Sequence, residues 1–204
     1  MNTDKGRWIQ AWWWPIALFA AAFLLRFYHL DIVRLWYDDT PINATAATIY
    51  ALKGYLAPDN WWTQPAKNIV RFVFVFVFGE SLLGWRMSTA VFGAASVTMA
   101  YLVARRAFRS YRVALFAAVL LMLDPLSILM GRSTSEEIVP AFFTLVAVLF
   151  CLRFLNRPNE YDLAFAASAI GTAVALRLYC AVAAVILTAA VLWRLRHELR
   201  DWWV

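Results

Sequence analysis

Residues 84–106 of the chain read GWRMSTAVFGAASVTMAYLVARR, an apolar stretch that ends in a pair of arginines. Its apolar part, from Gly84 to Ala104, is about as long as the roughly 20 residues that an α-helix needs to cross a bilayer. A basic cluster follows at once, made of Arg105, Arg106, Arg109 and Arg112. Because Lys and Arg accumulate in the cytoplasmic loops of membrane proteins, the stretch predicts a transmembrane helix that ends at the cytoplasm.

The rest of the chain has the same character. Of its 204 residues, 63% are hydrophobic and 16% are charged, whereas about a quarter of the residues in a soluble domain are charged. The formal net charge of +6 would suggest a nucleic-acid partner for a soluble domain. Here the arginines stand at the ends of apolar stretches, where they set membrane topology. We therefore expect a polytopic membrane protein with no nucleic-acid partner.

Five further apolar stretches are candidates for membrane helices: Trp12–Tyr28, Val113–Met130, Ile138–Leu152, Leu163–Leu176 and Leu178–Trp193. If each crosses the bilayer once, every basic cluster lies on the same side, and both termini are cytoplasmic. The sequence thus predicts an all-α, polytopic membrane helical bundle of about six transmembrane helices. We expect residues 1–204 to form a single module.

Between the first two predicted helices lies a polar and aromatic outer loop, residues 29–84, which is too long for an ordinary connection and should have structure of its own. Near its end Phe and Val alternate from Phe72 to Phe78, with the period of a β-strand. An isolated strand cannot satisfy its backbone hydrogen bonds in lipid. We therefore predict a helix at about residues 66–78 that lies in, or dips into, the membrane interface.

Two adjacent carboxylates, Asp38 and Asp39, lie early in this loop. A carboxylate pair at the face of a membrane costs free energy unless it binds a metal, a cationic group or a reacting hydroxyl. The predicted topology places this pair on the same outer side as Glu136, Glu137 and Arg177. The sequence therefore predicts that acids and an arginine meet in one outer cleft.

A series of short motifs runs along about 170 residues. It consists of Arg26 at the end of the first helix with Asp38-Asp39 after it, Gly54-Tyr55 and Gln64-Pro65 in the loop, Gly84 to Arg86, Tyr101 to Arg106, Arg132 before Glu136, and Arg177 at an outer turn. In this order the motifs resemble the GT-C glycosyltransferases, which include protein O-mannosyltransferases and aminoarabinose lipid A transferases. The acidic pair departs from the family's usual Asp-Glu.

The resemblance implies catalytic roles for Asp38 and Asp39, with the first acid as the base that activates an acceptor hydroxyl for attack on the anomeric carbon of a sugar. It implies that Glu136 and Glu137 are supporting acids. Asp38 and Glu136 are candidate ligands for a divalent cation (Mg²⁺, Mn²⁺ or Ca²⁺), which carboxylates suit. The alternative for each acidic pair is a helix cap, with Asp39 before a loop helix and the glutamates in a first helical turn.

Three cations are candidates to bind the phosphate of a polyprenyl-phosphate donor: Arg177, Lys67 and Arg132. An arginine between two apolar stretches is costly unless it is paired, and its planar fork suits a phosphate. The alternative for Arg177 is a residue that snorkels at a helical hairpin turn. Lys67 and Arg71 are suited either to bind the same phosphate or to anchor the interfacial helix. Arg26 and Arg132 are suited either to line the cleft or to snorkel.

The resemblance covers the family's N-terminal transmembrane module, beyond which family enzymes have further helices. It implies a glycosyltransferase-like protein of the bacterial inner (cytoplasmic) membrane that uses, or descends from the use of, a polyprenyl-phosphate-linked sugar at the outer face. Whether this chain is itself an enzyme is left open. The alternative is a non-catalytic subunit of a larger complex, with membrane lipid and other membrane proteins as partners.

Overall fold

The computed structural model of the protein describes residues 3–30, 66–79, 81–134 and 137–201, and the structural statements below concern these residues. Within them the chain is all-helical, as predicted. The elements are α1 (Thr3–Phe27), α3 (Ala66–Phe78), α4 (Leu82–Phe108), α5 (Tyr111–Leu123), α6 (Pro125–Arg132), α7 (Ile138–Asn156), α8 (Glu160–Leu176), the short 3₁₀ helix η1 (Leu178–Cys180) and α9 (Ala181–Asp201).

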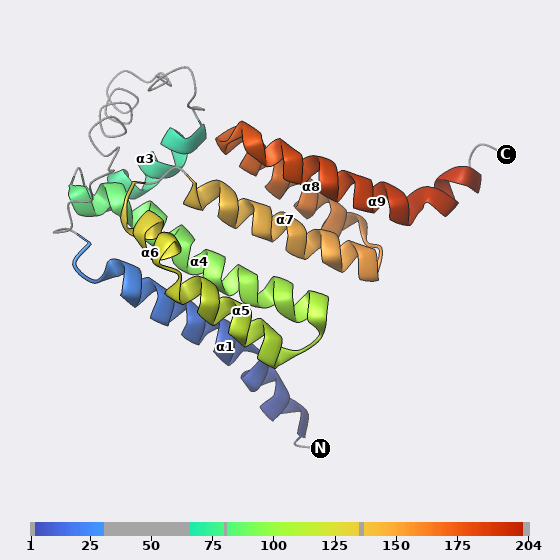
Figure 1. Ribbon diagram of the computed structural model, residues 1–204, viewed down its shortest axis with the longest axis horizontal. Helices are drawn as coiled ribbons and strands as arrows, with labels where there is room; N and C mark the ends of the chain where they lie inside the picture. The colour runs from blue at the N-terminus through green and yellow to red at the C-terminus, as the bar shows by residue number, and fades with distance from the viewer. Residues whose placement is uncertain (1–2, 31–65, 80, 135–136, 202–204) are drawn as a thin grey trace.

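Helix α4 is the centre of the bundle, because it contacts α1 and α5 on one side and α7 on the other (Figure 1). The contact between α1, α4 and α5 is made largely by small side chains, among them Ala22, Ala94, Ala114 and Ala118, all fully buried. Small residues let helix backbones approach closely, which is how helices associate in lipid, where apolar burial drives little. Helix α8 packs against α7, and α9 lies on both.

Three helices in the described residues are long and apolar enough to cross a membrane: Leu82–Phe108, Ile138–Asn156 and Leu178–Arg196. The protein is therefore a multi-pass membrane protein. The apolar part of α1, Trp13–Phe27, and the 17-residue α8 are shorter than any of these three helices. The predicted total of about six transmembrane helices stays a prediction.

The segment with alternating Phe and Val is a helix, α3, as predicted against its strand-like period. Along it Phe74 stacks on Phe78, one helical turn later, at a centroid distance of 6.4 Å, and also meets Phe92 of α4 edge-on at 6.2 Å. The helix therefore packs on the bundle through its aromatic face. Its place in the membrane interface stays a prediction.

The span predicted over Val113–Met130 is interrupted at Asp124, where α5 and α6 meet at an angle of 58°. The residue before a proline is disfavoured in helical conformation, and Asp124 accordingly has extended backbone angles (φ −61°, ψ 119°). Its carboxylate accepts a hydrogen bond from the Ser127 backbone N–H at 2.7 Å and so caps α6. A capped helix start inside the apolar stretch turns one predicted helix into two.

Arg26, at the end of α1, is fully buried and does not snorkel. It lies between two glycines, Gly93 of α4 and Gly131 of α6, and a Cβ on either would come within 2.8 Å or 2.7 Å of its Nε. Its guanidinium donates to the Ser127 hydroxyl at 2.8 Å and to the Ala22 carbonyl at 3.2 Å. One arginine thus joins α1, α4 and α6.

Candidate functional site

One end of the bundle holds the three predicted site residues whose side chains the structure describes, Glu137, Arg177 and Arg132. There α1 and α8 end and α4, α7 and α9 begin, and α3 and α6 lie beside them (Figure 1). By the predicted topology this is the outer end, opposite the clusters of arginines.

Glu137 stands at the N-cap position of α7, yet its side chain makes no capping hydrogen bond to that helix. Its Oε1 lies 3.3 Å from Nη2 of Arg177. Its other oxygen, Oε2, accepts a short hydrogen bond from the Tyr179 hydroxyl. The Glu137 side chain therefore does not cap α7. Its carboxylate instead links the start of α7 to the turn between α8 and α9.

Arg177 occupies that turn. Its backbone is extended (φ −153°, ψ 120°), and its N–H bonds to the Ala173 carbonyl at 2.9 Å, which ends α8. Its side chain is 21% exposed, whereas that of Glu137 is 47% exposed. The arginine therefore lies mostly within the protein, and the carboxylate partly in solvent. Such a partly exposed pair adds little stability.

Tyr179 was not among the residues predicted for the site. Aromatic residues near helix ends in a membrane protein are usually interfacial anchors, and this chain has many of them. The sequence signal that could have selected it is its position two residues after Arg177, in a turn between apolar helices. The structure adds Tyr179 to the cluster through its hydrogen bond to Glu137.

The chain that leads to Glu137 is held by two other helices. Ser133 and Thr134 are both buried, at 5% and 1% exposure. The Thr89 hydroxyl of α4 donates to the Ser133 carbonyl at 2.5 Å, and the Arg71 guanidinium of α3 donates to the Thr134 carbonyl. The hydrogen bond from Arg71 ties α3 to the segment after α6, and its phosphate-binding role stays a prediction. The start of α7 is thereby fixed relative to α3 and α4.

Arg132 is placed at the end of α6, where its Nη2 donates to the His29 carbonyl at 3.3 Å. It shares the outer end with Glu137 and Arg177. Lys67 belongs to α3, but its side chain is outside what the structure describes. The same holds for three predicted residues, Asp38, Asp39 and Glu136, so their convergence with Arg177 stays a prediction.

The predicted metal site also stays a prediction. Across the described ranges no group of three or more His, Cys, Asp or Glu side chains lies close enough together to hold a metal ion. Because the predicted ligands, Asp38 and Glu136, lie outside these ranges, the observation does not bear on them.

The family model of the dolichyl-phosphate-mannose-protein mannosyltransferases matches residues 43–204. The chain belongs to this family. The resemblance to GT-C glycosyltransferases is thereby confirmed, because the family is a member of that superfamily. No curated protein and no solved structure matches the chain.

As a member of the mannosyltransferase family, the protein is a glycosyltransferase-like membrane protein of the class that uses polyprenyl-phosphate sugar donors. The matched region contains Glu137, Arg177 and Tyr179 and begins after the Asp38-Asp39 pair.

Proposed function

We propose that the protein transfers a sugar from a polyprenyl-phosphate carrier to an acceptor hydroxyl at the outer face of a bacterial cytoplasmic membrane. The observation that carries the proposal is the Arg177 guanidinium, held 3.3 Å from Glu137 in a turn between two apolar helices. A partly buried arginine at a membrane face suits the phosphate of a lipid-linked donor. The name of the family includes dolichyl-phosphate-mannose, which makes mannose the first sugar to test.

In the proposed reaction the acceptor oxygen attacks the anomeric carbon, and a glycosidic C–O bond forms as the bond between that carbon and the phosphate oxygen breaks. Asp38 takes the proton of the acceptor hydroxyl. The polyprenyl phosphate leaves with the electron pair of the broken bond, and Arg177 stabilises the charge that develops on it. Lys67 and Arg132 provide further positive charge for the same phosphate.

Glu137 and Tyr179 are positioning residues in this proposal. The carboxylate contacts both the guanidinium and the phenol, so the arginine is oriented before a donor binds, which lowers the entropy lost on binding. Asp39 supports the base. Asp38 and Glu136 offer the hard oxygen ligands that Mg²⁺, Mn²⁺ or Ca²⁺ prefer, and such a cation would add positive charge beside the phosphate.

The test is sugar transfer in proteoliposomes. The full chain is reconstituted with radiolabelled polyprenyl-phosphate mannose and a Ser- and Thr-containing peptide, and the label on the peptide is counted. We expect transfer by the wild type and its loss in Asp38→Asn and Arg177→Gln. Arg194→Gln is the matched control, because Arg194 is an exposed arginine on α9 toward the other end of the bundle.

Three outcomes would count against the proposal. Full activity of Asp38→Asn would remove the base assignment, and full activity of Arg177→Gln would remove the phosphate-binding role. A wild-type protein that transfers no lipid-linked sugar, and that copurifies in constant ratio with other membrane proteins in mild detergent, would favour the alternative of a non-catalytic subunit.

A further inference from the structure

A second polar site lies at the opposite end of the bundle, where α4 and α7 end and α8 begins. It is a pocket of about 1260 Å³, which exceeds the ~300–1,000 Å³ typical of small-molecule sites. The described residues that line it include five arginines and one aspartate: Arg105, Arg106, Arg109, Arg153, Arg157 and Asp162. The lining therefore carries an excess of four positive charges.

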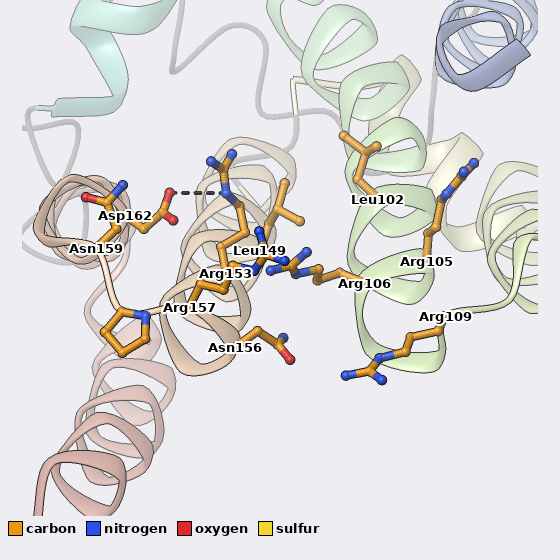
Figure 2. Close-up of a pocket in the computed structure, with 11 residues that line it drawn as sticks. Leu102, Arg105, Arg106, Arg109, Leu149, Arg153, Asn156, Arg157, Asn159 and Asp162 are labelled. Atoms are coloured by element: carbon orange, nitrogen blue, oxygen red, sulfur yellow. Dashed lines mark ion pairs between the residues drawn. The ribbon is translucent and has the colours of Figure 1, made fainter. Parts of the chain in front are cut away.

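The aspartate of the described lining already has a cationic partner. Asp162 is buried in the first turn of α8, and its Oδ1 lies 3.1 Å from Nε of Arg153 on α7. The same arginine lies over the Phe150 ring, 5.0 Å from its centroid. These contacts hold Arg153 against α8 and neutralise one charge of the five. No further carboxylate lies in the described lining. Arg105 points away from the other lining arginines in Figure 2 and donates to the Tyr101 hydroxyl at 2.7 Å.

The arginines come from two different helices and converge. In Figure 2 the side chains of Arg106, on α4, and Arg157, at the end of α7, extend toward each other across the pocket. The Nε of Arg106 is buried and has no hydrogen-bond partner among the described residues. Membrane topology requires only that Lys and Arg lie on one side of the bilayer, and it does not require these side chains to converge. Convergence of like charges around a hollow costs free energy unless an anion joins them.

The apolar part of the lining indicates what kind of anion. Leu102 and Leu149 also line the pocket, and each stands one helical turn before an arginine, namely Arg106 and Arg153. Because α4 and α7 are both long enough to cross a membrane, the leucines lie deeper in the bilayer than the arginines. The pocket is therefore apolar toward the membrane and cationic toward its surface.

We propose that this pocket binds the phosphate headgroup of an anionic phospholipid, with Arg106 and Arg157 on the phosphate and the leucines beside the first carbons of the acyl chains. Guanidinium forks bind phosphate oxygens in pairs, and basic pockets between membrane helices are known places for anionic headgroups. The proposal does not rest on sugar transfer, because it concerns the opposite end of the bundle.

The test is a lipid titration of the full chain in mild detergent. Phosphatidylglycerol, phosphatidylcholine with the same acyl chains, and inorganic phosphate are added separately, and the thermal unfolding midpoint and the lipid retained in native mass spectrometry are measured. We expect phosphatidylglycerol to raise the midpoint and to be retained, and phosphatidylcholine to do neither. Inorganic phosphate should have little effect, because it lacks the apolar part of the ligand.

Three variants distinguish lipid binding in the pocket from a general effect of positive charge. Arg106→Gln should weaken the apparent affinity for phosphatidylglycerol by about tenfold or more. Arg112→Gln removes the same charge from the same end of the bundle, but Arg112 is exposed and is not among the pocket residues, so the affinity should stay within about twofold. Arg106→Lys keeps the charge and the topology, and should still lose affinity because an ammonium cannot bind a phosphate as a fork.

Equal affinities for the wild type and both Arg106 variants would overturn the proposal. So would an equal loss in Arg106→Gln and Arg112→Gln, which would reduce the effect to net charge. If inorganic phosphate stabilises the protein as strongly as phosphatidylglycerol and displaces it, the lipid assignment is wrong and the ligand is a soluble phosphate.

Discussion

Arg26 and Ser127 are joined by a hydrogen bond of 2.8 Å between Nη2 and Oγ, although 101 positions separate them in the chain. The bond links the end of α1 to α6. Asp124, which caps α6, attracts the same guanidinium electrostatically. The short helix α6 is therefore held by a buried arginine that lies 101 positions earlier in the chain.

Replacement of Arg26 by Met should destabilise the protein by about 2–5 kcal/mol, because it removes the cation beside Asp124 and the hydrogen bonds to the Ser127 hydroxyl and the Ala22 carbonyl. The measurement is the thermal unfolding midpoint in mild detergent. Arg194→Met is the matched control, since Arg194 is exposed on α9, and its midpoint should not change. An equally small change in both variants would contradict the structural role of Arg26.

The glycines beside Arg26 provide a test by addition of a single methyl group. In Gly131→Ala the new Cβ would lie 2.7 Å from Nε and 2.9 Å from Cδ of Arg26. That side chain is fully buried and cannot withdraw, so we expect a loss of about 1–3 kcal/mol. Gly93→Ala should behave in the same way.

The control for the glycine test is Gly171→Ala in α8, where no described atom lies within 4 Å of the added Cβ. Because alanine has a higher helix propensity than glycine, this variant should be neutral or stabilised by up to about 1 kcal/mol. Thermal unfolding of the three variants side by side gives the comparison. A stable Gly131→Ala would show that Arg26 is not confined as described.

Asp124 has two roles that substitutions can separate. Asp124→Asn keeps an oxygen that can cap α6 and removes the charge beside Arg26. Asp124→Ala removes both and should be less stable than the Asn variant by about 1 kcal/mol, the usual contribution of an N-cap. Asn159→Ala at the N-cap of α8 is the reference, because the Asn159 side chain accepts a hydrogen bond from the Tyr161 backbone N–H at 3.0 Å. Equal midpoints for the two Asp124 variants would rule out the capping contribution.

The Glu137 cluster should matter more for activity than for stability. Its ion pair with Arg177 is partly exposed, so Glu137→Gln should change the free energy of unfolding by no more than about 1 kcal/mol. If the proposed transfer is correct, the same variant should lower kcat/KM by about tenfold or more, because the arginine loses its orientation.

Tyr179→Phe extends this test, since it removes one contact of Glu137 and leaves the ion pair. We expect a smaller loss of activity than in Glu137→Gln, measured as the rate of sugar transfer in proteoliposomes. An unfolding midpoint that falls steeply in both variants would instead assign the cluster to the packing of α7 on the turn before α9.

Much of the architecture follows from local sequence. The stretch from Gly84 to Ala104 and the arginines after it predict α4 with its end within a few residues, because a long apolar run has no other stable arrangement in lipid. The helix over Ala66–Phe78 follows from the same argument, against its alternating pattern. The break at Asp124 is visible as an Asp-Pro pair, but its 58° bend depends on the cap that the carboxylate makes.

The candidate site was predicted less completely. Topology alone puts Glu137 and Arg177 on one side of the membrane, and the structure brings them into contact. The sequence does not predict that Tyr179 belongs to the site, because aromatic residues at helix ends are common in membrane proteins. Nor does it predict that Arg26 is buried, since the space for it comes from two glycines far away in the chain.

Composition and apolar length are enough to determine that this chain is helical, lies in a membrane and has its basic clusters at one end, because each residue's preference for lipid or water acts locally. Which side chains meet across helices depends on how each helix is rotated and how closely its neighbours approach, and that is set by the packing of small residues along α4. The contacts of Arg26, of Glu137 with Arg177, and of the arginines around the opposite pocket follow from that packing.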